Sequence, residues 1–121
     1  VVETAREDDR LYTENKIVKK EEAIGKWNDV LVNMKWTKKD DGFFKVWINN
    51  KLKYEYNGPT KTEEKVFFKF GIYRAFLSKY IKYQKITGNN INEVPAQVVY
   101  FDEVRVGKSK EEVVGNLPPL Q

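Results

Sequence analysis

The feature that most constrains the fold is a series of short segments in which apolar and polar residues alternate. Within residues 28–36, apolar side chains recur at every second position, at Val30, Val32, Met34 and Trp36, with Leu31 as the exception. Successive side chains of a β-strand point to opposite faces, so a period of two is typical of a half-buried strand. An amphipathic helix would instead repeat its apolar residues every three or four positions. This segment is therefore predicted to be a strand.

Turn-forming clusters separate this segment from those that follow. Residues 38–42 form a polar stretch that ends in glycine, and Asn49-Asn50 can adopt the positive φ angles of a two-residue hairpin turn. Asn57-Gly58-Pro59-Thr60 is a third turn signal. Strands are expected between these turns, at residues 43–48 and 52–56. Further strands are expected at 66–74 and 98–106, and residues 16–20 are a weak strand candidate.

In the remaining segments, apolar residues do not recur at a regular interval. Residues 75–95 contain Gly88-Asn89-Asn90 and are predicted to form a long loop. Ser109 followed by Glu112 fits a capping box, which predicts a short helix that ends before Gly115. Residues 1–15 are expected to be frayed or a linker, and residues 115–121 a tail. The pattern predicts one all-β domain over residues 1–121, an antiparallel β-sandwich.

The amino-acid composition limits which catalytic groups and metal ligands the chain can supply. The chain has no Cys and no His, which excludes a disulfide scaffold and removes the commonest general base and metal ligand. Acid–base catalysis would have to use Tyr, Lys or a carboxylate. No phosphate-binding loop or metal-ligand cluster is present, so no cofactor is expected. The chain also lacks an apolar run of the roughly 18 residues that span a membrane, so no membrane partner is expected.

Positive charge is concentrated in one part of the chain. The net charge is +4, and residues 61–85 hold seven Lys and Arg against two Glu. A local positive field favours an anionic partner, although a solvated lysine-rich rim would have the same composition. In this stretch, strand alternation places Lys69, Gly71 and Tyr73 on one face, with Lys69 and Tyr73 about 13 Å apart. A sugar-sized ligand could lie between them, or Lys69 could simply be a surface residue beside Phe67.

Four blocks of the sequence resemble the jelly-roll polysaccharide lyases, the group that includes heparin lyase I and glucuronan lyase. The blocks are GKWND at 25–29, DGFFKVWIN at 41–49, KFGIYR at 69–74 and YFDEVRVG at 100–107. The resemblance implies a jelly-roll, concanavalin A-like fold. It also implies cleavage of an acidic, uronic-acid-containing polysaccharide by β-elimination, with Tyr73 as the proton-transfer residue and Lys69 as the stabiliser of the substrate carboxylate.

Four other residues are candidates for substrate binding. Arg74 follows Tyr73 in the block, although strand alternation would place it on the opposite face, where a structural ion pair is an alternative. Trp47 could stack on a sugar ring or pack within the fold. Thr60 could line a substrate groove or belong only to a tight turn, and Lys65 belongs to the basic stretch.

The family also uses a His and a Gln from earlier in the domain, and this chain has no His. The resemblance therefore implies a C-terminal portion of a longer domain, with the N-terminal portion as a partner and with secretion or a periplasmic location. The alternative function is a non-catalytic β-sandwich module that binds anionic glycans. Nucleic-acid binding is disfavoured, because most aromatic residues fall on the expected core face.

Overall fold

The computed structural model describes residues 2–5 and 12–115, with side chains from Asn15 onward. Two compact units divide the chain. Unit 1 extends to Phe67, and unit 2 runs from Phe68 to the end of the described residues at Gly115. Each unit is described separately below, and the single domain over residues 1–121 stays a prediction.

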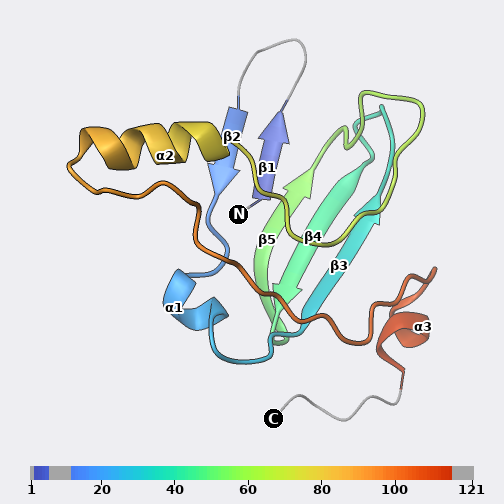
Figure 1. Ribbon diagram of the computed structural model, residues 1–121. Helices are drawn as coiled ribbons and strands as arrows, with labels where there is room; N and C mark the ends of the chain where they lie inside the picture. Colours follow the sequence, from blue (N-terminus) through green and yellow to red (C-terminus); the bar gives the residue numbers. More distant parts are fainter. Residues whose placement is uncertain (1, 6–11, 116–121) are drawn as a thin grey trace. The chain divides into compact units, whose positions relative to one another are not determined.

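An antiparallel sheet of three strands is the main element of unit 1 (Figure 1). The strands are β3 (Val30–Lys35), β4 (Phe43–Ile48) and β5 (Lys51–Asn57), in the order β3-β4-β5. The strand expected within residues 28–36 and the two strands expected between the turns are thus confirmed, because the alternation and the turn residues pointed to the same boundaries.

The strand register gives the sheet one apolar face. Val32, Val46 and Tyr54 lie opposite one another across the three strands, and Met34, Phe44 and Tyr56 form the next row. The Phe44 and Tyr54 rings are in edge-to-face contact, with centroids 6.3 Å apart. Among the described residues, the buried apolar side chains are Val46 and Ile48 of the central strand, which are 3% and 6% exposed. The core of this unit therefore lies along β4.

The β4–β5 connection is the two-residue turn that the sequence predicted. Asn49 and Asn50 have φ angles of 50° and 63°. Asn49 also connects the turn to the residues before β3. Its Oδ1 accepts a hydrogen bond of 2.9 Å from the backbone N–H of Asp29, and its Nδ2 donates one of 3.0 Å to Oδ1 of Asn28.

The two asparagines of this turn should differ in their contribution to stability. Asn49→Gly keeps the backbone conformation accessible but removes both side-chain hydrogen bonds, so we expect a loss of about 1–2 kcal/mol. Asn50→Gly is the matched control, since glycine adopts positive φ freely, and it should change stability by less than about 0.5 kcal/mol. Chemical denaturation of both variants measures the difference. Equal losses would show that the side-chain bonds of Asn49 contribute nothing.

A second sheet is formed by β1 (Val2–Ala5) and β2 (Tyr12–Asn15), which pair antiparallel with Val2 opposite Asn15. Residues 1–15 were expected to be frayed or a linker, and their described parts are instead paired strands. β-branched and aromatic residues such as Thr4, Tyr12 and Thr13 favour this conformation. Residues 1 and 6–11 lie outside the described residues.

The weak strand candidate at residues 16–20 is wrong. A short helix, α1 (Lys20–Ala23), begins at its last residue, and the backbone of residues 16–19 joins no sheet. The sequence KEEA has good helix formers and two acids in the first turn, which interact favourably with the helix dipole. Local helix propensity is therefore stronger here than the short apolar alternation.

The strands expected at 66–74 and 98–106, most of whose residues belong to unit 2, are absent from the described structure. Gly71 and Glu103 have φ angles of 139° and 51°, and each interrupts the extended backbone that a strand requires. The two segments are nevertheless in contact, since the rings of Phe70 and Phe101 pack edge to face with centroids 5.3 Å apart. Aromatic packing thus occurs here without strand pairing.

The long loop expected at residues 75–95 contains a helix, α2 (Leu77–Ile86) (Figure 1). Leu77, Tyr80 and Ile81 recur at positions i, i+3 and i+4, which is the start of a helical apolar pattern. Interspersed lysines and tyrosines obscure this pattern in the sequence. The helix ends at Thr87, whose N–H donates to the carbonyl of Tyr83, and Gly88 follows with φ 85°.

The short helix near the end of the chain is confirmed as α3 (Lys110–Val114). The Ser109 hydroxyl accepts a hydrogen bond of 3.3 Å from the backbone N–H of Glu112, as the capping box predicted. Gly115 follows with φ 53°, and the rest of the expected tail lies outside the described residues.

Antiparallel sheets confirm the all-β class, and the described structure corresponds to part of an all-β domain. Large apolar side chains remain exposed in both units, among them Trp27, Phe67, Phe68, Tyr100 and Val106. Closure into a two-sheet jelly roll stays a prediction. Of the helices described, none has the length and hydropathy needed to cross a bilayer.

Candidate functional site

The segment that carries Lys69 and Tyr73 is extended but irregular. Gly71 lies midway between them with φ 139°, a conformation that residues with a Cβ rarely adopt. Side chains therefore do not alternate regularly along this segment, and the two-face assignment made for a regular strand does not hold. Tyr73 is 92% exposed, so its ring and hydroxyl are open to solvent.

Tyr73 lines an open pocket of about 340 Å³ in unit 2. We call it the Tyr73 pocket; the residues that line it include Tyr73, Arg74, Leu77, Tyr80, Pro95 and Gln97. Its volume is at the lower end of the roughly 300–1,000 Å³ that is usual for small-ligand sites. Its walls combine two tyrosines, a guanidinium and an amide with apolar side chains, which suits a polar ligand that also has an apolar face.

Arg74 connects the two sides of the Tyr73 pocket. Its Nη2 donates a hydrogen bond of 2.8 Å to the carbonyl oxygen of Pro95. The sequence left open an ion pair between Arg74 and an acid on a neighbouring strand. In the structure, Arg74 instead bonds to the backbone. A guanidinium has five N–H donors, so this single bond leaves donors for a carboxylate ligand. Arg74 thus lies in the same pocket as Tyr73 and not on a face directed away from it.

Lys69 is exposed, and the residues that line the Tyr73 pocket do not include it. The structure therefore brings together two of the six predicted site residues, Tyr73 and Arg74. Lys65, Trp47 and Thr60 belong to unit 1. Lys65 is exposed, and its substrate-binding role stays a prediction.

Trp47 lies on the second face of the three-stranded sheet. The register places it opposite Leu31 and Leu52, and Lys45 lies two residues away on the same face. Lys45 Nζ forms an ion pair of 2.8 Å with Glu55 across the sheet. The hydrogen bond and the charge of Lys45 lower the pKa of the Glu55 carboxyl below its usual value. Trp47 is half-buried, so part of its side chain packs within the fold and part remains open as an aromatic surface.

The Thr60 hydroxyl is bonded to the backbone around the end of β3. It accepts a hydrogen bond of 2.9 Å from the N–H of Thr37 and donates one of 2.5 Å to the carbonyl of Lys35. The backbone N–H of Thr60 also donates to the Thr37 carbonyl, at 2.9 Å. These bonds support the tight-turn alternative, and a role for Thr60 in substrate binding stays a prediction.

Thr60→Val should reveal which role dominates. The change keeps the shape of the side chain but removes the hydroxyl, so we expect a loss of about 1–2 kcal/mol in the free energy of unfolding. Thr60→Ser is the control, because it keeps the hydroxyl and should recover most of that stability. Denaturant titration gives the stabilities, and glycan affinity measured on the same samples should be unchanged. A valine variant of normal stability and reduced glycan affinity would favour the groove-lining role.

The sequence alone did not identify Tyr80 and Gln97 as neighbours of Tyr73. Tyr80 reaches the pocket from α2, and Gln97 reaches it from the segment that follows Pro95. The helical spacing of Leu77, Tyr80 and Ile81 was the signal that could have identified Tyr80. Gln97 had no such signal, since only the fold of unit 2 brings it to Tyr73. No cluster of metal-ligating side chains occurs within the described residues.

Comparison with known protein families identifies a match. A family model described as "Polysaccharide lyase" matches residues 3–105, which is most of the chain. Neither the curated proteins nor the solved structures include a significant match. The matched range includes β2 to β5, all of β1 except Val2, α1, α2 and all the residues of the Tyr73 pocket. The chain belongs to the polysaccharide lyase family.

Proposed function

We propose that this protein cleaves a uronic-acid-containing polysaccharide by β-elimination, with Tyr73 transferring the proton and Lys69 stabilising the substrate carboxylate. In this reaction, a base removes the proton on C5 of the uronate. The C5 electron pair then forms the C4–C5 double bond as the C4–O glycosidic bond breaks, and an acid protonates the departing oxygen. No water is consumed, and the new chain end is an unsaturated uronate.

The observation that carries the proposal is the position of Tyr73 beside Arg74 in an open pocket. The phenol is solvent-accessible, so its hydroxyl can approach a sugar ring without rearrangement of the backbone. In the proposed reaction, Tyr73 accepts the C5 proton as its phenolate. After taking the C5 proton, the same hydroxyl can return it to the departing oxygen, so one residue serves as base and then as acid.

The cationic residues would act on the substrate carboxylate. When the uronate carboxylate is paired with a cation, the C5 proton is easier to remove, because the enolate that develops is then stabilised. Arg74 has free donors at the pocket, and Lys69 lies five residues before it on the same segment. In the proposed complex, substrate binding brings Lys69 to this carboxylate. The His and Gln implied by the resemblance would come from an upstream portion of the domain.

The test is an assay for the unsaturated product. The chain, alone and joined to any sequence encoded upstream of it, is incubated with polyglucuronate, and the ultraviolet absorbance of the C4–C5 double bond is followed. A neutral glucan of equal length is the control, and it should give no signal because it has no carboxylate. Failure of every form of the protein to generate the absorbance would contradict the proposal.

A non-catalytic module that binds anionic glycans is the second candidate. It is favoured by one observation, namely that Lys69 is not among the residues that line the Tyr73 pocket. This alternative predicts tight binding of polyglucuronate with no unsaturated product. Either function would place the protein where large polysaccharides occur, outside the cell or in the periplasm.

A further inference from the structure

One face of α2 carries three lysines, Lys79, Lys82 and Lys85, which we call the α2 lysine row. They are spaced three residues apart, so each is a neighbour of the next on the helix surface. The helix has no acidic residue, and like charges at this spacing destabilise a helix. Intrahelical ion pairing therefore does not explain why the three lysines occur together.

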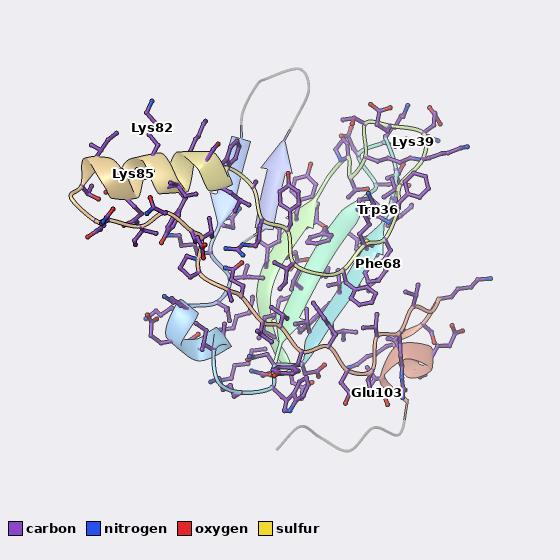
Figure 2. The ribbon with its side chains drawn as sticks, viewed as in Figure 1. Trp36, Lys39, Phe68, Lys82, Lys85 and Glu103 are labelled. Atoms are coloured by element: carbon purple, nitrogen blue, oxygen red, sulfur yellow. The ribbon has the colours of Figure 1, made fainter. Side chains whose placement is uncertain are left out.

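The α2 lysine row also has no carboxylate partner in the described part of the chain. The described ion pairs use other cations, namely Lys35, Lys38, Lys45 and Arg105. Lys79 Nζ lies 4.7 Å from the centre of the exposed Phe76 ring, and this contact leaves its charge uncompensated. Figure 2 shows the Lys82 side chain projecting from α2 on the side away from the segment that follows the helix.

The row and the Tyr73 pocket occupy different sides of α2. Leu77 and Tyr80 are the helix residues that line the pocket. At about 100° per residue, Lys82 lies roughly opposite them around the helix axis. The row is therefore centred on the side of α2 that does not line the pocket, and none of its three lysines is among the lining residues.

An exposed aromatic side chain lies beside Lys79, at one edge of the α2 lysine row. Tyr83 is 62% exposed and is four residues from Lys79, so the two share one side of the helix. Sugar rings have apolar faces that pack on aromatic rings, and uronates add one negative charge per residue. A surface with spaced cations and an aromatic ring fits a chain of charged sugars better than it fits a single small anion.

We propose that the α2 lysine row is a second binding surface for anionic polysaccharide, which holds the polymer outside the Tyr73 pocket. This proposal rests on the proposed function, because it assumes that the ligand of the pocket is a polyuronate. A polymer long enough to reach both surfaces binds the second one as an intramolecular step, which raises its affinity without changing the pocket. A short oligosaccharide can occupy the pocket alone and gains nothing from the row.

The test compares two triple variants of the whole chain. In the first, Lys79, Lys82 and Lys85 are replaced by Gln. In the matched control, three exposed lysines of unit 1 are replaced, Lys26→Gln, Lys51→Gln and Lys53→Gln. Both variants lose three positive charges, so net charge is held equal. Removal of like-charge repulsion should leave the thermal midpoint of the first variant unchanged or slightly higher.

Affinity is measured by calorimetry for long polyglucuronate and for its trisaccharide. We expect the α2 variant to lose about tenfold or more in affinity for the polymer and less than about twofold for the trisaccharide. The control should lose less than about twofold for both ligands. Polymer binding by the wild-type chain should weaken as salt rises, and the α2 variant should show a shallower dependence.

Three results would overturn the proposal: unchanged polymer affinity in the α2 variant, an equal loss in the control, or no binding of polyglucuronate by the wild-type chain. Tighter binding of a single-stranded oligodeoxynucleotide of equal charge would assign the row to nucleic acid instead. Failure of the lyase proposal is seen separately, as absence of unsaturated product. If no unsaturated product forms but the α2 lysine row still binds the polymer, the row is a glycan-binding surface of a non-catalytic protein.

Discussion

Tyr73→Phe should lower kcat for polyuronate cleavage by about 10²–10⁴-fold, the usual contribution of a general acid–base group. The substitution keeps the ring and removes only the hydroxyl that exchanges the proton. Because the side chain is 92% exposed, its loss of an oxygen leaves no buried group unpaired, and the thermal midpoint should not change. Initial rates of product absorbance and a thermal melt measure the two effects.

Tyr100→Phe is the matched control for this experiment. Tyr100 is also strongly exposed and belongs to unit 2, but it does not line the Tyr73 pocket. Its phenylalanine variant should keep wild-type turnover. If Tyr73→Phe leaves turnover intact while Tyr80→Phe abolishes it, then the proton passes through the other tyrosine of the pocket and our assignment is wrong.

Lys69→Ala should reduce kcat/KM by about 10²–10³-fold, the range found when one group that stabilises transition-state charge is removed. Unlike the tyrosine variant, it should raise KM as well as lower kcat, because the ammonium meets the carboxylate both before and during the reaction. Steady-state kinetics separate these two parameters. Lys69→Arg restores the charge and should recover part of the loss.

The control for Lys69 is Lys108→Ala, which removes an exposed lysine from the same unit. It should leave both kinetic constants near wild type. If Lys69→Ala changed the kinetics no more than this control, the carboxylate would be paired by Arg74 alone. That result would agree with the pocket of the unbound structure, which Lys69 does not line.

The local sequence pattern was sufficient to predict those elements that are stabilised by residues close together in the sequence. The strands of the three-stranded sheet, the Asn49-Asn50 turn and the Ser109 cap were all predicted. Each depends on contacts within a few residues or across a tight hairpin, where alternation and turn chemistry agree. Short blocks of sequence also indicated a polysaccharide lyase, and the family comparison agrees at that level over residues 3–105, whereas the heparin lyase I and glucuronan lyase group stays a prediction.

Other elements were decided by backbone conformation that residue patterns do not encode. The segments around Gly71 and Glu103 have the apolar alternation of strands, yet one residue with positive φ in each interrupts the extended chain. A strand also needs a neighbour to satisfy its hydrogen bonds, and the sequence of one segment cannot specify that neighbour. For the same reason, alternation predicted opposite faces for Tyr73 and Arg74, whereas both line one pocket.

The sequence by itself limited the acid–base groups that this chain can supply, because a chain without His or Cys leaves Tyr, Lys and carboxylates for the task. It also determined where the main sheet forms. Only the tertiary structure decided that Arg74 is held by the Pro95 carbonyl, that Tyr80 and Gln97 lie with Tyr73, and that Lys69 is outside this group. These neighbours come from α2 and from a segment more than 20 residues downstream. Pro95 and Gln97 meet Tyr73 and Arg74 only through folding of the chain over this separation, which hydrophobic period and composition do not record.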